Sequence, residues 1–490
     1  MHRGATQRGA ALFWAAAYFA AALLPRLSPL VAGVLFGDDF IHRPEGHLQS
    51  YRFLNYAELS FWELLFGPRY LMGAAPKIIA ALYTTGLCAA LRASLREWGA
   101  APRVANLLLL LLPLHPLWNT FIVWNSTGVY VLSLLLIVLG YRWLSRAGAR
   151  FTIGAILMMA VGISGYQVHL GLLPALVFAE IVLSEEKLRS WPRIAARRVL
   201  ACGAAAGLYF LATKLALFAG LETWGGRGLA SNVTGVMGFS AIHRVADNLA
   251  VITQPFLSFY GGLEAAWRLW TVPYLVTAVL TVLVLSAGRR FAAATTTALL
   301  TLVLPLSAAS VVVALNFPPS GPRVAAAIWI ATLLATLPFL QRLDAMRRWP
   351  VAAMAVLFIA LALPVTLTDA KNWRRAWEAD PRTANAILQQ WGSASGVTIA
   401  IHGTDLRRPL PEDWESRPIV MQNFTPVTPF EYSNIVYYPE WMLASYGFRV
   451  VFRPTDMPRP PTTHSELAEW RHEPAQRETL LAPYGWRPRH

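Results

Sequence analysis

Apolar runs of about 20 residues recur along this chain, separated by short stretches of polar residues. A run of that length crosses about 30 Å of hydrocarbon as an α-helix, which rises about 1.5 Å per residue. A membrane β-barrel would instead show alternating apolar and polar positions in segments of about ten residues. The pattern therefore predicts a bundle of membrane-spanning helices.

Residues 151–183 form a predominantly apolar run that is too long for one crossing. As a single helix it would extend about 50 Å, and basic residues flank it on both sides, at Arg150 and Lys187. Two short spans that turn at Gly165 to His169 fit both observations. The predicted fold is an all-α polytopic membrane protein with about eleven transmembrane helices. The predicted spans lie near residues 10–36, 72–91, 104–117, 127–144, 151–183 (two spans), 200–221, 269–286, 292–315, 324–340 and 351–367.

The net charge of +15 follows from the topology. Short loops rich in Lys and Arg face the cytoplasm, and Arg3 and Arg8 place the N-terminus inside. The excess of basic residues falls in the loops that this topology places inside, so the charge does not indicate binding to nucleic acid. A cleaved signal peptide is the alternative at the N-terminus, but the first run continues to Phe36 without a small-residue cleavage site.

The composition agrees with a membrane protein and removes some kinds of chemistry. Apolar residues make up 56% of the 490 residues and charged residues 14%, against about 25% charged in soluble proteins. Cys88 and Cys202 both fall inside apolar runs, which excludes a disulfide framework and a thiolate zinc site. The sequence has no glycine-rich motif for holding nucleotide phosphates, which disfavours a nucleotide-sugar donor.

The composition becomes polar and mixed after the last predicted span. Residues 380–390 are predicted to form a helix, and residues 397–402 and 449–452 read as short strands. The chain is thus divided into a transmembrane catalytic domain, residues 1–367, and a small extracytoplasmic α/β domain, residues 368–490.

Asp38 and Asp39 are the strongest candidates for catalysis because two adjacent carboxylates stand where the first apolar run leaves the membrane. Reduced hydration at such an interface can adjust the pKa of a general base, and carboxylates also ligate divalent metal ions. A metal requirement stays open at this stage. The alternative is that the pair is only a solvated helix end.

Seven further residues are predicted to bind substrate. Guanidinium groups offer a planar fork of donors that suits phosphate, and an ammonium within an apolar run is expected to face protein or water. Glu58 lies on a predicted amphipathic helix, residues 51–66, where a wetted helix face is an equal alternative. Gln167 and His169 could either line a cavity or cap the hairpin turn. The set is Arg43, Glu58, Arg69, Lys77, Gln167, His169 and Arg323.

The arrangement resembles the C-type glycosyltransferases, and among them the glucosyl transferase type II family, which is associated with O-antigen modification and serotype conversion. The resemblance rests on four stretches: Asp38-Asp39 followed by Arg43, the turn Gly67-Pro68-Arg69, Tyr166-Gln167, and Asp380 with Ala384 to Ile387. It implies a polyprenyl-phosphate sugar as donor, glucose as the sugar, and a catalytic acid in the first outer loop.

The predicted function is transfer of a sugar to an extracytoplasmic glycan such as the O-antigen of lipopolysaccharide, at the periplasmic face of a bacterial inner membrane. Asp38 or Asp39 would be the base, with inversion at the anomeric carbon. Predicted partners are the lipid-linked donor, the glycan acceptor and the lipid bilayer. A lipid transporter or flippase would require an internal repeat and ionisable residues at mid-membrane, and the sequence shows no such repeat. A structural subunit of the cell envelope remains a third alternative.

Overall fold

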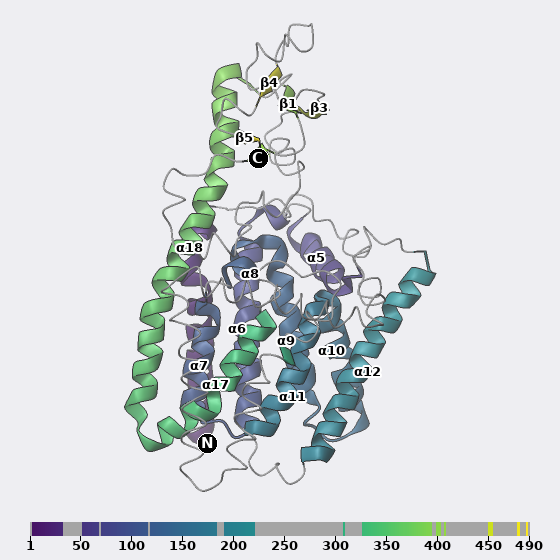
Figure 1. Ribbon diagram of the computed structural model, residues 1–490, viewed down its shortest axis with the longest axis vertical. Helices are drawn as coiled ribbons and strands as arrows, with labels where there is room; N and C mark the ends of the chain where they lie inside the picture. Colours follow the sequence, from purple (N-terminus) through teal and green to yellow (C-terminus); the bar gives the residue numbers. More distant parts are fainter. Residues whose placement is uncertain are drawn as a thin grey trace, which may run out of the picture.

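The computed structural model describes residues 2–32, 51–67, 70–115, 118–183, 191–220, 307–308 and 326–393, together with the strand residues 398–402, 406–407, 449–453, 478–480 and 487–488. These residues form a bundle of helices with a group of short strands beyond one of its ends (Figure 1). The N-terminal end of α1 lies at the opposite end of the bundle (Figure 1).

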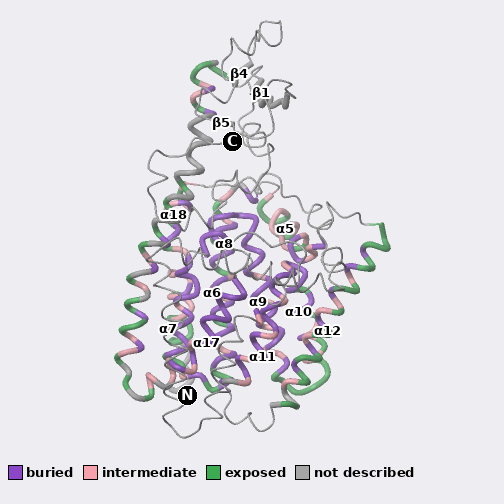
Figure 2. Tube along the Cα trace, in the orientation of Figure 1, coloured by how far each residue is buried: buried purple, intermediate pink, exposed green. Residues whose placement is uncertain are grey.

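The bundle contains long helices and shorter linking turns. Its elements are α1 (His2–Leu23), η1 (Leu24–Arg26), α2 (Leu27–Val31), α5 (Phe53–Phe66), η2 (Tyr70–Met72), α6 (Ala75–Glu97), α7 (Pro102–Leu114), α8 (Asn119–Val123), η4 (Asn125–Thr127), α9 (Gly128–Trp143), α10 (Ala149–Gly165), η5 (Gln167–Gly171), α11 (Leu172–Leu183), α12 (Trp191–Phe218), α17 (Ala326–Met346) and α18 (Arg348–Trp391). The buried residues lie mainly on the central helices α6, α7 and α9, and exposed residues line the outer helices α12 and α18 (Figure 2).

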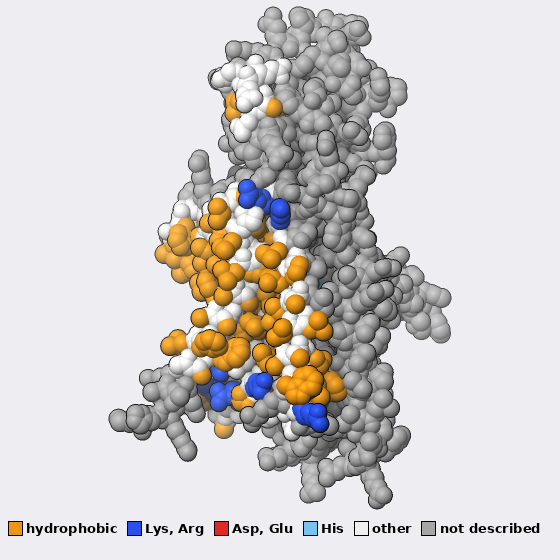
Figure 3. Space-filling view, turned by 90° about the vertical axis from the view of Figure 1, so that its left-hand side faces the viewer, with side chains coloured by type: hydrophobic (Ala, Val, Ile, Leu, Met, Phe, Trp, Pro, Cys, Tyr) orange, Lys and Arg blue, Asp and Glu red, His pale blue; other side chains and the backbone are white. Residues whose placement is uncertain are grey.

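The described helices make this an all-α membrane protein. Five segments within the described residues are long and apolar enough to span a bilayer: Gly9–Val31, Ala75–Glu97, Asn125–Trp143, Ala195–Phe218 and Ala326–Ala345. Further apolar helices of 10–17 residues accompany them. On the face that carries α18, apolar side chains cover the bundle between groups of Lys and Arg side chains near its two ends (Figure 3). This distribution suits a surface in contact with lipid.

The structure confirms the predicted turn within residues 151–183, while the two short spans on either side of it stay a prediction. Helix α10 ends at Gly165, η5 makes the turn, and α11 begins at Leu172. Helices also cover most of the other described residues of the predicted spans. The spans predicted at residues 269–286 and 292–315 lie outside the described residues.

Glycines allow the close packing of α9 against α10. A Cβ atom at Gly162 would lie 2.9 Å from the carbonyl oxygen of Ser133 and 2.8 Å from Cγ1 of Ile137. At Gly140 it would lie 2.8 Å from the carbonyl oxygen of Ala155. Small residues of this kind let membrane helices approach closely and gain van der Waals contact.

We expect Gly162→Ala to lower the thermal unfolding midpoint of the purified protein, with a loss of about 1–3 kcal/mol, because backbone atoms of α9 leave no room for the added methyl group. Gly203→Ala is the matched control on α12, where a new Cβ would meet no atom within 4 Å. Equal midpoints for the two variants would contradict the role of Gly162.

Helix α18 runs for 44 residues and contains the boundary predicted between residues 367 and 368. The helix predicted at residues 380–390 is its last part, in which Ala384 and Ile387 are fully buried. The division into two domains stays a prediction.

Short strands follow α18 in the sequence. Strand β1 (Thr398–His402) pairs in parallel with β3 (Arg449–Arg453) and with β4 (Glu478–Leu480), and β2 (Leu406–Arg407) pairs antiparallel with β5 (Arg487–Pro488). Strands β1 and β3 lie where the sequence predicts strands. Thr398 is opposite both Arg449 and Glu478, so β1 is the central strand of its sheet.

Candidate functional site

Five of the predicted site residues lie outside the residues that the structure describes: Asp38, Asp39, Arg43, Arg69 and Arg323. The acid pair belongs to the stretch between α2, which ends at Val31, and α5, which begins at Phe53. Its flanking elements are therefore known, whereas the roles of the five residues stay predictions.

Glu58 lies where α5 packs against α6. Its Oε1 accepts a hydrogen bond of 3.1 Å from the hydroxyl of Tyr83, and that hydroxyl accepts one of 3.0 Å from Nε1 of Trp62. Next to these hydrogen bonds, Leu59 packs in a small apolar cluster with Tyr70. Although the Glu58 side chain is only half-buried, desolvation of its carboxyl raises the pKa of Glu58 to about 7.

This raised pKa predicts that the protein loses stability as the pH rises. The folded state holds the Glu58 proton more tightly than the unfolded state, whose ordinary pKa is about 4.5. The contribution of Glu58 to stability is therefore fully present below about pH 4.5 and is lost as the pH rises through about 7. The partial exposure limits the effect to about 1–3 kcal/mol. We expect Glu58→Gln to flatten the dependence of the thermal unfolding midpoint on pH across this window. An unchanged slope would show that Glu58 does not titrate there.

Lys77 lies in the first turn of α6 and is turned into the protein, with 1% of its surface exposed. Its Nζ donates a hydrogen bond to Oδ1 of Asn125 in η4. The amide nitrogen of Asn125 in turn donates to the carbonyl oxygens of Leu71 and, at 3.1 Å, Gly73. The prediction that this ammonium avoids lipid is confirmed. The hydrogen bond to Asn125 joins α6 to η4, which directly precedes α9.

Gln167 and His169 share the turn η5 and contact different helices. Nε2 of Gln167 donates a hydrogen bond of 2.7 Å to the hydroxyl of Tyr209 on α12. Nδ1 of His169 lies 2.9 Å from Oγ of Ser133 on α9, and the His169 ring stands edge-on to Tyr166. Both side chains are buried, so they join the turn to its neighbours and face the inside of the bundle.

The structure adds Arg52, which the sequence analysis missed. Its Nη1 donates a hydrogen bond of 3.0 Å to the hydroxyl of Tyr130, and its guanidinium carbon lies 5.8 Å and 5.6 Å from the ring centroids of Tyr130 and Tyr166. Tyr51 precedes it with a φ of 54°, in the left-handed region that residues with a side chain seldom adopt. An arginine placed directly before an amphipathic helix was the available signal.

The four described candidates all lie at one end of the bundle, which we call the α5 end because it carries α5, η2, η4 and η5. They do not form one cluster. Lys77 and Tyr83, the partner of Glu58, are six positions apart on α6 and so point about 120° apart around the helix axis. Glu58 therefore lies at the side of α6 that faces α5, and Lys77 at the side that faces η4.

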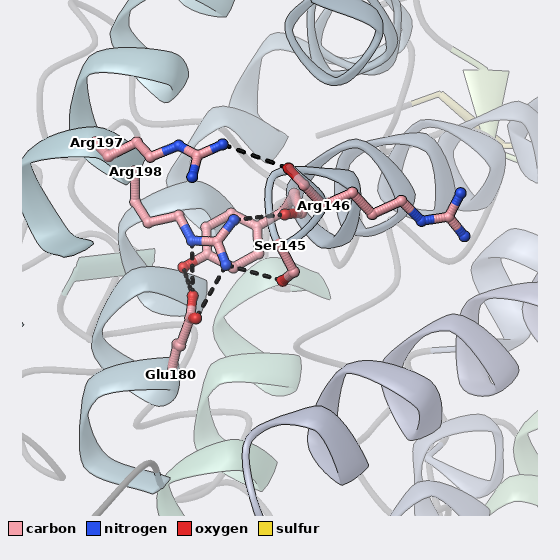
Figure 4. A network of polar contacts seen from close by, with 6 residues as sticks. Ser145, Arg146, Glu180, Arg197 and Arg198 are labelled. Atoms are coloured by element: carbon pink, nitrogen blue, oxygen red, sulfur yellow. Dashed lines mark hydrogen bonds and ion pairs between the residues drawn. The ribbon is translucent and has the colours of Figure 1, made fainter. Parts of the chain in front are cut away.

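The opposite end, called the basic end, carries a buried ionic network that was also missed (Figure 4). Arg198 on α12 donates two hydrogen bonds of 2.9 Å to the carboxylate of Glu180 on α11. It also donates to the carbonyl oxygen of Tyr141 at 3.2 Å and to Oγ of Ser145 at 2.9 Å. The hydroxyl of Tyr141 donates to Glu180 at 2.7 Å. These contacts join α12 to α11, to α9 and to the turn that follows α9, which indicates a structural role.

Within the part of the chain that the structure covers, no three His, Cys, Asp or Glu side chains are grouped so as to hold a metal ion. The fold and the polar groups at the α5 end define a membrane-embedded helical protein with a polar interior at one end. Comparison with models of protein families, with curated proteins and with solved structures finds no match to this chain.

Proposed function

We propose that the protein is a glycosyltransferase that moves a sugar, glucose by the resemblance, from a polyprenyl-phosphate carrier to a glycan acceptor such as O-antigen. We place it in the bacterial inner membrane, with about eleven spans, a C-terminal α/β domain of residues 368–490 outside, and the reaction at the periplasmic face.

The observation that carries the proposal is the location of the described candidates. Glu58, Lys77, Gln167 and His169 lie at the α5 end, where the acid-containing stretch rejoins the bundle at Tyr51. Arg142 and Arg198 lie at the other end. Polar and ionisable side chains are rare inside membrane bundles, and where they are paired within the protein they commonly mark a substrate site or pathway. A reaction at the α5 end would use both this polar interior and the acid pair.

In the proposed reaction, Asp38 or Asp39 takes the proton of the acceptor hydroxyl as its oxygen attacks the anomeric carbon. The bond from that carbon to the lipid phosphate breaks, and the phosphate leaves with the electron pair. Arg69, Lys77 and Arg323 are the proposed cations for the leaving group, because charge-assisted hydrogen bonds stabilise a developing phosphate charge. Attack from the side opposite the phosphate inverts the anomeric centre.

The competing function is transport of a lipid-linked sugar without transfer. A transporter places ionisable groups near the membrane midplane, between two halves related by a repeat. In the described residues the candidates lie instead at one end of the bundle. This arrangement favours chemistry at a surface over passage through the membrane.

The deciding experiment uses the full-length protein in lipid nanodiscs with a synthetic polyprenyl-phosphate glucose and purified O-polysaccharide. Transfer of glucose to the polysaccharide is the expected result. Movement of the same lipid across proteoliposomes without any glycan product would replace the proposal by the transporter.

A further inference from the structure

The C-terminal half of helix α5 exposes apolar side chains. Phe61, Leu64, Leu65 and Phe66 are all more than half exposed, whereas Asn55 is 1% exposed. A helix that faces water has the opposite arrangement. The outer side of α5 therefore suits lipid at the membrane interface. On its inner side the buried residues are Leu54, Asn55 and Leu59, so Asn55 is a polar side chain among apolar ones.

Arg52 directly precedes α5. Its guanidinium is held by the hydroxyl of Tyr130 and lies over two tyrosine rings, so few rotamers remain open to it. The carbonyl oxygen of Tyr51 accepts a hydrogen bond of 3.3 Å from the hydroxyl of Tyr209, which supports the left-handed turn before Arg52. The entry to α5 is thus fixed to α9 and α12.

Asn55 lies in the first turn of α5, three residues after Arg52, and it precedes the buried Leu59 by one helical turn. Neither Nδ2 nor Oδ1 of Asn55 has a hydrogen-bond partner among the described residues. A buried donor or acceptor without a partner costs about 1–3 kcal/mol, and proteins rarely leave both atoms of one amide in that state. An unpartnered amide on the buried face of α5 points to a ligand.

The chemistry of the amide selects the class of ligand. Asn55 offers donor hydrogens on Nδ2 and an acceptor on Oδ1. A phosphate has only acceptor oxygens, so it would leave Oδ1 without a donor and next to negative charge. A hydroxyl group both donates and accepts, and two neighbouring hydroxyls of a sugar ring can pair with both amide atoms.

We propose that Asn55, three residues after the fixed Arg52, binds neighbouring hydroxyl groups of a saccharide. This inference rests on the proposed function and adds to it a residue that selects the sugar. The saccharide is the sugar of the donor or that of the acceptor, and the two share the same hydroxyl chemistry.

The test compares the wild type with Asn55→Leu in nanodiscs, using three ligands: polyprenyl-phosphate glucose, polyprenyl phosphate without sugar, and purified O-polysaccharide. Leucine keeps the approximate volume and removes both polar atoms. The matched control is Asn106→Leu on α7, because Asn106 is also buried but its Oδ1 accepts hydrogen bonds from Tyr18 and Arg92. Dissociation constants and thermal unfolding midpoints are measured for each protein.

We expect Asn55→Leu to weaken binding of one saccharide ligand about tenfold, to leave binding of bare polyprenyl phosphate unchanged, and to keep or raise the unfolding midpoint. Loss for the glucosylated lipid assigns the site to the donor sugar, and loss for the polysaccharide assigns it to the acceptor. Asn106→Leu should lower the midpoint and leave both affinities unchanged.

Two results would overturn the inference, and they differ. If Asn55→Leu keeps the affinity for every saccharide ligand and lowers the midpoint, the amide is held by water and is structural, while the proposed function stands. If the wild type binds neither the glucosylated lipid nor the polysaccharide, the proposed function fails and the saccharide site fails with it.

Discussion

Replacement of Asp38 or of Asp39 by Asn is expected to lower sugar transfer by about 10²–10⁴-fold at neutral pH. An amide has nearly the shape of a carboxylate but does not accept a proton, so the acceptor hydroxyl would attack without a base. Fold and membrane insertion should change little, because the substitution preserves size. Initial rates with saturating polyprenyl-phosphate glucose measure the effect.

Asp344→Asn is the control for this experiment. Asp344 is an acid near the C-terminal end of α17. Gln341 of the same helix donates a hydrogen bond to the carbonyl oxygen of Gly99, which follows the end of α6, so Asp344 lies on the side of the bundle opposite the α5 end. Its loss should leave the transfer rate within about twofold of the wild type, in keeping with the small effects of most substitutions away from a site. Wild-type rates in Asp38→Asn, in Asp39→Asn and in the double variant together would show that the acid pair is only a solvated helix end.

The number of helices in residues 151–183 was predictable because it depends on length and charge alone. A run too long for one crossing and bounded by Arg150 and Lys187 required a turn, and η5 provides it. The strand at residues 398–402 was predictable from another local feature, a short run that includes β-branched residues. Such features are local, so they need no knowledge of which helices touch.

The pairing of side chains depends on how each helix is rotated and which neighbour it meets, and the sequence does not give that information. Lys77 and Glu58 both look like site residues, but they face different sides of α6. Arg52 contacts Tyr130, which is 78 positions further along the chain. Its role follows only from the packing of α5 beside α9.

The buried ion pair at the basic end provides the other large expected effect. We expect Arg198→Met to destabilise the protein by about 3–5 kcal/mol, because it leaves the carboxylate of Glu180 buried without its cation. The side chains of Arg198 and Glu180 are only 6% and 2% exposed, so water cannot replace the lost partner. Denaturant or thermal unfolding of the purified protein measures the loss.

Two further variants separate the cost of an orphaned charge from the value of the pair. Glu97→Gln breaks the ion pair between Arg142 and Glu97 at the same end of the bundle, but those side chains are 31% and 38% exposed, so the loss of stability should stay below about 1 kcal/mol.

The double variant Arg198→Met with Glu180→Leu removes both buried charges. It should regain most of the stability that Arg198→Met loses, since apolar side chains of similar volume often replace a buried pair without penalty. The hydroxyl of Tyr141 then loses its acceptor, so recovery should fall short by about 1–3 kcal/mol. A double variant no more stable than Arg198→Met alone would mean that the network is needed as a whole to join α9, α11 and α12.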